Sequence, residues 1–219
     1  MKKPETEAIS GFCCKLHFHS AEKKVTDSIE YIMVQNIKMK TILVFVSTLD
    51  GKVTKWGNPF VRLWSSKDDQ HYFNKLWNDT RLIVMGSNTY NADPMKPSSN
   101  HLLVIMTQHP SEYRRIETLG QLEFTNESPE QLFERFDKED QDQMLIVGGA
   151  HIATSFFKEE LIDELWLTIE PKIFGTGGSF VLEEKLDINL QLISCERVNV
   201  QGTLIAKYSV IKNKNIKLK

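Results

Sequence analysis

The chain has few cysteines, no long apolar run and no large excess of charge of one sign. Three cysteines in 219 residues cannot build a disulfide framework, so we expect a reducing compartment and a cytoplasmic protein. No apolar stretch approaches the roughly 20 residues of a membrane span, and no apolar segment follows Lys2 and Lys3 as in a signal peptide. A formal net charge of −2 argues against nucleic acid or an anionic membrane as a partner.

Residues 1–38 differ from the rest of the chain and are predicted to form an N-terminal arm or extension. The segment from Cys13 to Ser20 holds two Cys and two His, but their spacing is not that of zinc ligands, and we predict no metal site. Residues 39–212 are predicted to form one catalytic domain, because their composition supports a single full core. A short basic tail, residues 213–219, follows.

The junction of a strand and a helix around Gly148 and Gly149 is the most informative motif. An apolar run, Met144 to Val147, predicts a buried strand, and a helical pattern begins directly after the glycine pair. Glycines allow a ligand to approach the backbone closely, and the first turn of a helix offers unpaired N–H groups to a phosphate. The alternative interpretation is a tight connection without a ligand.

Two further strand ends resemble this junction. The apolar run Leu82 to Met85 ends at Gly86, and the run Thr41 to Val46 leads to the Asp50-Gly51 turn. In open α/β sheets, ligands bind outside the carboxyl ends of the strands. Three small or polar strand ends therefore predict a cofactor cleft at one edge of the sheet.

The pattern of the remaining elements predicts an α/β fold. Ser66 is expected to cap a helix that ends near Asp79, and Ser128 is expected to open another with a proline at its first position. Strands and helices alternate up to Ile169, and the last strands follow one another without helices. This order predicts a mostly parallel central sheet with an antiparallel C-terminal edge and helices on both faces.

Four segments in this order carry a family resemblance: STLDGK (47–52), MGSNTYNADP (85–94), LIVGGAHIATSF (145–156) and IDELWLTIEPKIFGTGG (162–178). Together they resemble the dihydrofolate-reductase-like superfamily, and most closely the C-terminal reductase domain of the bifunctional deaminase/reductase of riboflavin biosynthesis. The resemblance spans roughly residues 40–211 and rests on order and spacing rather than on one motif.

The resemblance implies an NADPH-dependent reductase with a homodimeric assembly. It assigns cofactor binding to eight positions: Val46, Gly86, Ser87, Thr89, Gly148, Gly149, Ala150 and Ile152. Reduction of a C=N bond needs a hydride donor beside the carbon and a proton source for the nitrogen. Asp69 is the candidate proton source, because it lies on the inner stripe of its helix; its alternative role is helix capping.

Substrate binding is expected from Trp64, Phe73 and Asp50, although a core aromatic and a structural turn residue are the alternatives for the first and the last. The chain departs from the riboflavin reductases at Val147, where those enzymes carry a glutamate, and at Gln70 and His71, where they carry arginines. We therefore expect a pyrimidine or pterin-like substrate, nominally 5-amino-6-(5-phosphoribosylamino)uracil. A folate or pterin reductase and a non-catalytic nucleotide-binding protein are the alternatives.

Overall fold

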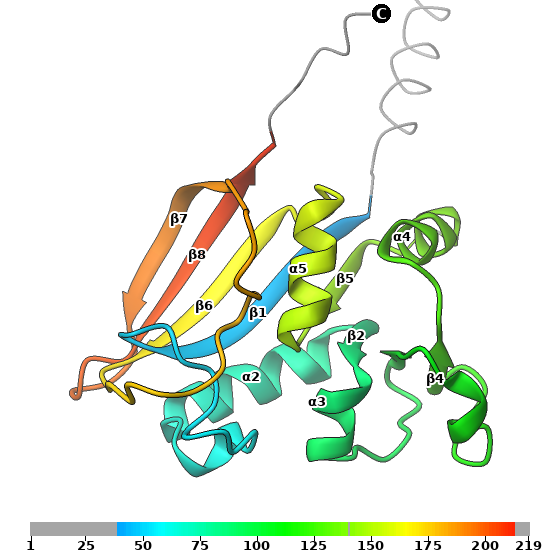
Figure 1. Ribbon diagram of the computed structural model, residues 1–219, viewed down its shortest axis with the longest axis horizontal. Coiled ribbons are helices and arrows are strands. Elements are labelled where there is room, and N and C mark those ends of the chain that lie inside the picture. The colour runs from blue at the N-terminus through cyan, green and yellow to red at the C-terminus, as the bar shows by residue number, and fades with distance from the viewer. Residues whose placement is uncertain (1–38, 140, 213–219) are drawn as a thin grey trace, which may run out of the picture. The chain divides into compact units, whose positions relative to one another are not determined.

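The computed structural model describes residues 39–139 and 141–212, and the predicted arm and tail lie outside these ranges. Within them, the chain forms an eight-stranded sheet flanked by helices (Figure 1). The strands are β1 (Lys40–Thr48), β2 (Leu82–Gly86), β3 (Leu102–Met106), β4 (Leu122–Thr125), β5 (Gln143–Ile146), β6 (Glu164–Glu170), β7 (Asn189–Arg197) and β8 (Leu204–Ile211). The helices are η1 (Val61–Leu63), α2 (Lys67–Asp79), α3 (Ser87–Ala92), η2 (Pro110–Tyr113), α4 (Pro129–Lys138) and α5 (Ala150–Lys158).

The sheet is mostly parallel, as the sequence predicted. Its strand order is β4-β3-β2-β5-β1-β6-β8-β7, and the first six of these strands run parallel to one another. β8 pairs with β6 antiparallel, and β7 completes the antiparallel C-terminal edge. The three glycine or polar strand ends of β1, β2 and β5 are therefore neighbours at one edge of the sheet, which is the arrangement that a cofactor cleft requires.

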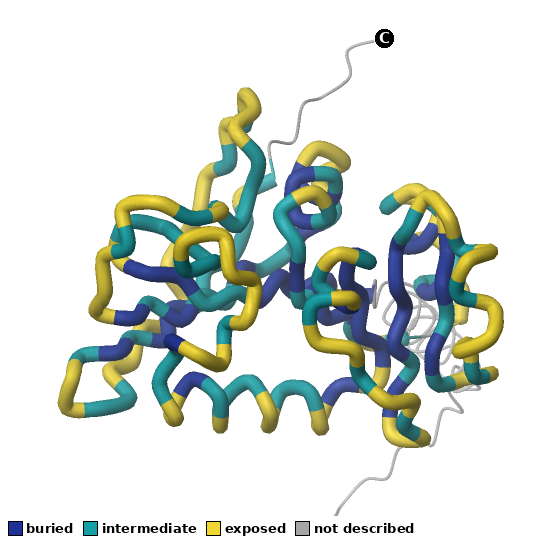
Figure 2. The backbone as a smooth tube through the Cα atoms, turned by 60° about the horizontal axis from the view of Figure 1, so that its bottom comes forward, coloured by how far each residue is buried: buried dark blue, intermediate teal, exposed yellow. Residues whose placement is uncertain are grey.

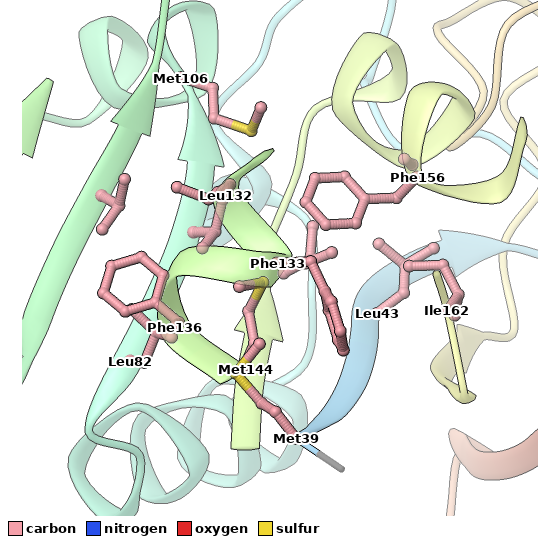
Figure 3. Close-up of a cluster of buried hydrophobic side chains, with 14 of the residues drawn as sticks. Met39, Leu43, Leu82, Met106, Leu132, Phe133, Phe136, Met144, Phe156 and Ile162 are labelled. Atoms are coloured by element: carbon pink, nitrogen blue, oxygen red, sulfur yellow. The ribbon is translucent and has the colours of Figure 1, made fainter. Parts of the chain in front are cut away.

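Helices α4 and α5 cover one face of the sheet. Alternate residues of the strands point to this face, so that Leu43 of β1 and Met144 of β5 pack against Phe133 of α4 and Phe156 of α5 in one cluster (Figure 3). The aromatic residues of both helices are at least nine-tenths buried. This cluster fixes α5, and with it the glycine pair that precedes the helix.

Helix α2 covers the opposite face. Phe73 and Leu76 pack on Ile42 and Val44 of β1, the residues that alternate with the first set. Farther along the sheet, α3 contributes Tyr90 to a cluster with β2, β3 and β4. Figure 2 shows the buried strands at the centre of the fold and the exposed loops around them. Helices thus lie on both faces, as predicted.

The sequence analysis did not predict the 3-10 helices η1 and η2, the strand β4 or the helix α3. β4 has only four residues and lies at the edge of the sheet, and α3 has six residues. β4 is interrupted by Glu123 and α3 is mostly polar, so neither shows the continuous apolar run that revealed the equally short β5. Among residues 39–139 and 141–212, no helix is both long enough and apolar enough to cross a bilayer.

Candidate functional site

A cleft of about 370 Å³ lies between α2 and the carboxyl ends of β1, β2 and β5. One wall comes from the glycine junction before α5 and from α3, and the opposite wall comes from α2. The lining is mostly apolar with a few polar groups, as is typical of a site for a flat organic ligand. Its lining includes Val46, Arg62, Asp69, Gln70, Tyr72, Phe73, Thr89, Asp93, Val147, Gly148, Gly149 and Ala150.

The glycine wall is closely packed around Thr89 of α3. A Cβ atom at Gly149 would stand 3.0 Å from the Thr89 hydroxyl, and one at Gly148 would stand 3.3 Å from it. Gly148 also has a φ of +122°, which residues with side chains rarely adopt. The peptide bond between the two glycines is cis. A larger residue at either position would have to displace Thr89 or enter the cleft.

The first turn of α5 is free of side-chain capping. Gly149 is the N-cap residue and makes no side-chain hydrogen bond, and no acidic residue lies in the first turn. The N–H groups at the start of a helix have no partner within it, and the helix dipole favours an anion there. The start of α5 therefore has the features of a helix end that can receive an anionic group.

The opposite wall carries a buried acid. Asp69 is 5% exposed, lies at the third position of α2 and donates its backbone N–H to the N-cap Ser66 at 3.2 Å. Burial raises the pKa of its carboxyl group, and the nearby charge of Glu170 also raises it, while hydrogen bonds with Thr168 and Ser65 lower it. The balance is upward, so Asp69 keeps its proton to a higher pH than an exposed aspartate.

Tyr72 adds a second proton-bearing group to this wall, which sequence reasoning missed. It lies three residues after Asp69 on the same face of α2, and that spacing was the signal that could have revealed it. Burial, and then the charge of Asp69, raise its pKa to about 12, so the phenol is neutral. Its hydroxyl is buried and has no hydrogen-bond partner among the described residues. A polar atom of a ligand would satisfy it.

The structure brings seven of the predicted site residues to the cleft: Val46, Asp69, Phe73, Thr89, Gly148, Gly149 and Ala150. Five others do not line it, namely Asp50, Trp64, Gly86, Ser87 and Ile152. Gly86 and Ile152 contact each other behind the glycine wall, where a Cβ atom on Gly86 would stand 3.0 Å from the Ile152 side chain. These two residues therefore let α5 approach β2.

Asp50 and Trp64 have structural partners beside the cleft. The Asp50 carboxylate accepts hydrogen bonds from the Thr48 hydroxyl and from the backbone N–H groups of Phe174 and Gly175. The Thr48 bond is the main reason why its pKa is lowered. Trp64 is 4% exposed and packs edge-on against Phe174, with ring centroids 5.1 Å apart. Both residues hold the loop after β6 in place.

Positive charge is scarce in the cleft. Arg62 is the one Lys or Arg among its described lining residues, and its guanidinium lies 3.6 Å from the carboxylate of Asp93. Gln70 lines the cleft, but its amide donates to the carbonyl oxygens of Arg62 and Ser65. Val147 also lines the cleft, and His71 is exposed. A substrate phosphate would meet only this one paired cation.

Solved structures of reductases and related proteins share this architecture. A putative riboflavin biosynthesis protein from Shewanella sp. PV-4 is 20% identical, with a TM-score of 0.63 over 80% of this chain and 100% of that one. Dihydrofolate reductase from Enterococcus faecalis, solved in complex with NADP(H), is 16% identical, with a TM-score of 0.54 over 80% of this chain and 98% of that one. The fold is that of the dihydrofolate-reductase-like proteins.

The bifunctional diaminohydroxyphosphoribosylaminopyrimidine deaminase/5-amino-6-(5-phosphoribosylamino)uracil reductase of Thermotoga maritima also matches, at 17% identity and a TM-score of 0.63. The match covers 87% of this chain and 62% of the other, so this chain spans less than two thirds of that protein.

The sequence model of the RibD C-terminal domain family matches residues 39–204, and this chain belongs to that family. Among curated proteins, the uncharacterized protein YwjB of Bacillus subtilis strain 168 is 25% identical over 151 residues, which make up 64% of this chain and 82% of YwjB. The uncharacterized protein YyaP of the same organism is 23% identical over 176 residues, 74% of this chain and 91% of YyaP.

Proposed function

We propose that this protein is an NADPH-dependent reductase of a pyrimidine or pterin-like heterocycle, nominally of the 5-amino-6-(5-phosphoribosylamino)uracil reductase type. The observation that supports this proposal most is the cleft. One of its walls has an uncapped helix end and a glycine pair, and the other has the buried acid Asp69. Membership of the RibD C-terminal domain family and the reductase neighbours support the same class.

The cofactor half of the cleft fits a nicotinamide dinucleotide. Gly148, Gly149 and Ala150 would bring backbone N–H groups to its pyrophosphate, and Val46 would lie against its nicotinamide ring. Space for the backbone to approach exists because neither glycine carries a Cβ atom. When bound, NADPH supplies the hydride for the reaction.

The residues of α2 would supply the proton and the orientation. Reduction of a C=N bond adds a hydride to carbon and a proton to nitrogen, and Asp69 in its acid form can donate that proton. Tyr72 can hydrogen-bond a polar edge of the heterocycle, since its hydroxyl has no partner among the described residues. Phe73 gives the flat ring an apolar surface and excludes water from the reacting bond.

A folate or pterin reductase is the second candidate function. The ion pair between Arg62 and Asp93 favours this candidate. Arg62 is the one Lys or Arg among the described residues of the cleft lining, so the phosphate of a phosphoribosyl substrate would have to compete with Asp93 for it. A pterin needs no such cation and presents N–H groups that a carboxylate can bind.

Turnover of NADPH with a panel of substrates tests the function. The panel contains the phosphoribosylamino-uracil compound, its unphosphorylated ribosyl form, a dihydropterin and dihydrofolate, with NADH as a competing cofactor. Oxidation of NADPH with any of them supports the reductase assignment, and the preferred compound separates the two candidates. Tight binding of NADPH without oxidation of any panel member would instead support a nucleotide-binding protein.

The Gly149→Val variant tests the location of the cofactor. Its side chain would collide with Thr89, which a Cβ atom already approaches to 3.0 Å, and would enter the cleft where the pyrophosphate is proposed. We expect at least about a tenfold loss of NADPH affinity, measured by fluorescence titration of a variant whose circular dichroism spectrum matches the wild type. Unchanged affinity in the folded variant would place the cofactor elsewhere.

A further inference from the structure

A second carboxylate, Glu170, is buried at the start of the helix that carries Asp69. It is the last residue of β6, is 1% exposed and does not line the cleft. One of its oxygens accepts the backbone N–H of Ser66 at 2.6 Å. Ser66 is the N-cap of α2, and its hydroxyl accepts the backbone N–H of Asp69. Glu170 therefore connects the end of the sheet to the helical turn that carries the acid.

The other oxygen of Glu170 connects the same point to the C-terminal hairpin. It accepts the hydroxyl of Thr203 at 2.9 Å, and Thr203 is fully buried in the turn between β7 and β8. Asn199 closes this turn by accepting the N–H groups of Gly202 and Thr203. Its amide also donates to the Asp68 carboxylate of α2 at 3.0 Å. The hairpin turn and the helix thus meet at one buried carboxylate.

The charge of Glu170 opposes the ionisation of Asp69 and adds to the larger effect of burial on its pKa. Glu170 faces it from β6 and Tyr72 from α2. On β8, the ammonium of Lys207 lies 3.8 Å from the centre of the Trp166 ring and 6.0 Å from that of Tyr72. Lys172 donates its ammonium group to the carbonyl oxygen of Trp64.

We propose that Glu170 is a positioning residue, which ties the first turn of α2 and the β7–β8 turn to the end of β6 and thereby fixes the place of Asp69 at the cleft. This inference rests on the proposed function, in which Asp69 donates the proton. Glu170 itself touches neither the cleft nor the substrate. Its role is to fix where the acid lies and to keep a second negative charge from forming beside its own.

The Glu170→Gln variant tests this role, because glutamine keeps the size and an oxygen acceptor but removes the charge. Loss of the neighbouring charge makes Asp69 ionise more readily, so the pH above which kcat/KM falls moves to lower pH. The carboxyl carbon of Asp69, followed by NMR in the substrate-free protein, should titrate at lower pH as well. A descending limb and an Asp69 titration that both stay in place overturn the proposal.

Thr203→Val is the matched control. It removes a hydrogen bond to Glu170 but keeps the carboxylate, so we expect a lower melting temperature without a move of the Asp69 titration to lower pH. If this control moves the titration to lower pH as Glu170→Gln does, the effect is loosened packing and the proposal is overturned.

The wild-type protein provides a measurement that needs no variant to fold. The carboxyl carbon of Asp69, followed by NMR in the substrate-free wild-type protein, should titrate above the ordinary pKa of an aspartate, because burial and the neighbouring Glu170 both raise that pKa. A titration of Asp69 at or below the ordinary value overturns the proposal. This titration needs neither substrate nor turnover. It can therefore contradict the role of Glu170 in an active enzyme, or support that role even if no substrate of the panel is reduced.

Discussion

At the scale of single residues, burial of an acid in a ligand cleft has a cost in stability. The folded chain raises the pKa of Asp69 above its ordinary value of 3.8, chiefly through burial. At a pH between the pKa of Asp69 in the unfolded chain and its higher pKa in the folded chain, the folded state binds more protons than the unfolded state. The contribution of Asp69 to stability is therefore complete below the unfolded pKa and is lost as the pH rises through the folded pKa.

The Asp69→Asn variant should remove this pH dependence. Asparagine keeps the size of the side chain and cannot ionise. The stability of the variant relative to wild type should therefore increase as the pH rises from the unfolded pKa of Asp69 through its folded pKa. Urea unfolding at a series of pH values measures it. Activity should fall by about 100-fold or more, because the proton donor is lost. An equally active variant would leave Asp69 as a residue of the helix end only.

Tyr72 gives a second prediction at this scale. The Tyr72→Phe variant removes a buried hydroxyl that has no partner among the described residues, so the melting temperature should stay the same or rise. If the hydroxyl binds the substrate, KM should rise by about fivefold, which corresponds to one ordinary hydrogen bond. A lower melting temperature with an unchanged KM would show that the phenol serves the fold.

At the scale of elements, the helix start is what places the acid. Ser66 and Ser128 are both N-cap residues, and each hydroxyl accepts the backbone N–H three residues later at 3.2 Å. Both caps were predicted from the sequence, because the chemistry of a cap is local. One cap carries Asp69 beside the cleft, whereas the other opens α4. The pair therefore forms a natural control.

The Ser66→Ala and Ser128→Ala variants should each lose about 1 kcal/mol of stability, measured by denaturant unfolding. Only Ser66→Ala should also lower kcat, because it removes the hydroxyl that accepts the backbone N–H of Asp69 and so loosens the turn that holds the acid. Equal loss of activity in the two variants would show that catalysis depends on overall stability rather than on the start of α2.

Local signals explain which parts of the site the sequence could predict. Gly148, Gly149 and the strand before them were recognised because glycine chemistry and apolar runs are visible over a few residues. Asp50 and Trp64 were assigned to the substrate, yet both contact Phe174, which lies more than a hundred positions away in the chain. Glu170 was missed for the same reason, since only the folded chain brings the end of β6 to the start of α2. Tyr72 differs, because its spacing of three residues from Asp69 on α2 was a local signal. Contacts between distant segments carry no local signal.

At the scale of the whole molecule, the C-terminal edge of the sheet exposes an apolar surface. All nine residues of β7 are exposed, and among them Leu190, Leu192 and Ile193 are exposed by 40%, 54% and 52%. β7 is the last strand in the sheet order, and its pairing with β8 is irregular between Leu192 and Ser194. Such an irregularity bends an edge strand and discourages the addition of another strand.

We propose that a second copy of the chain covers this surface, through packing of side chains rather than by extension of the sheet. The homodimer then explains why a strand with three large apolar residues remains exposed in one chain. Light scattering at micromolar concentration should give twice the 25.3 kDa mass of one chain.

The Leu192→Lys variant should shift this mass toward that of the monomer, because each interface would bury two new charges that have no partner. The matched control is Leu119→Lys, which replaces a fully exposed leucine in the turn before β4 and should leave the mass unchanged. The β7–β8 turn also holds Glu170 through Thr203. Leu192→Lys should therefore lower activity more than Leu119→Lys does. A wild-type mass near 25.3 kDa would contradict the dimer and leave the apolar edge of β7 to another partner.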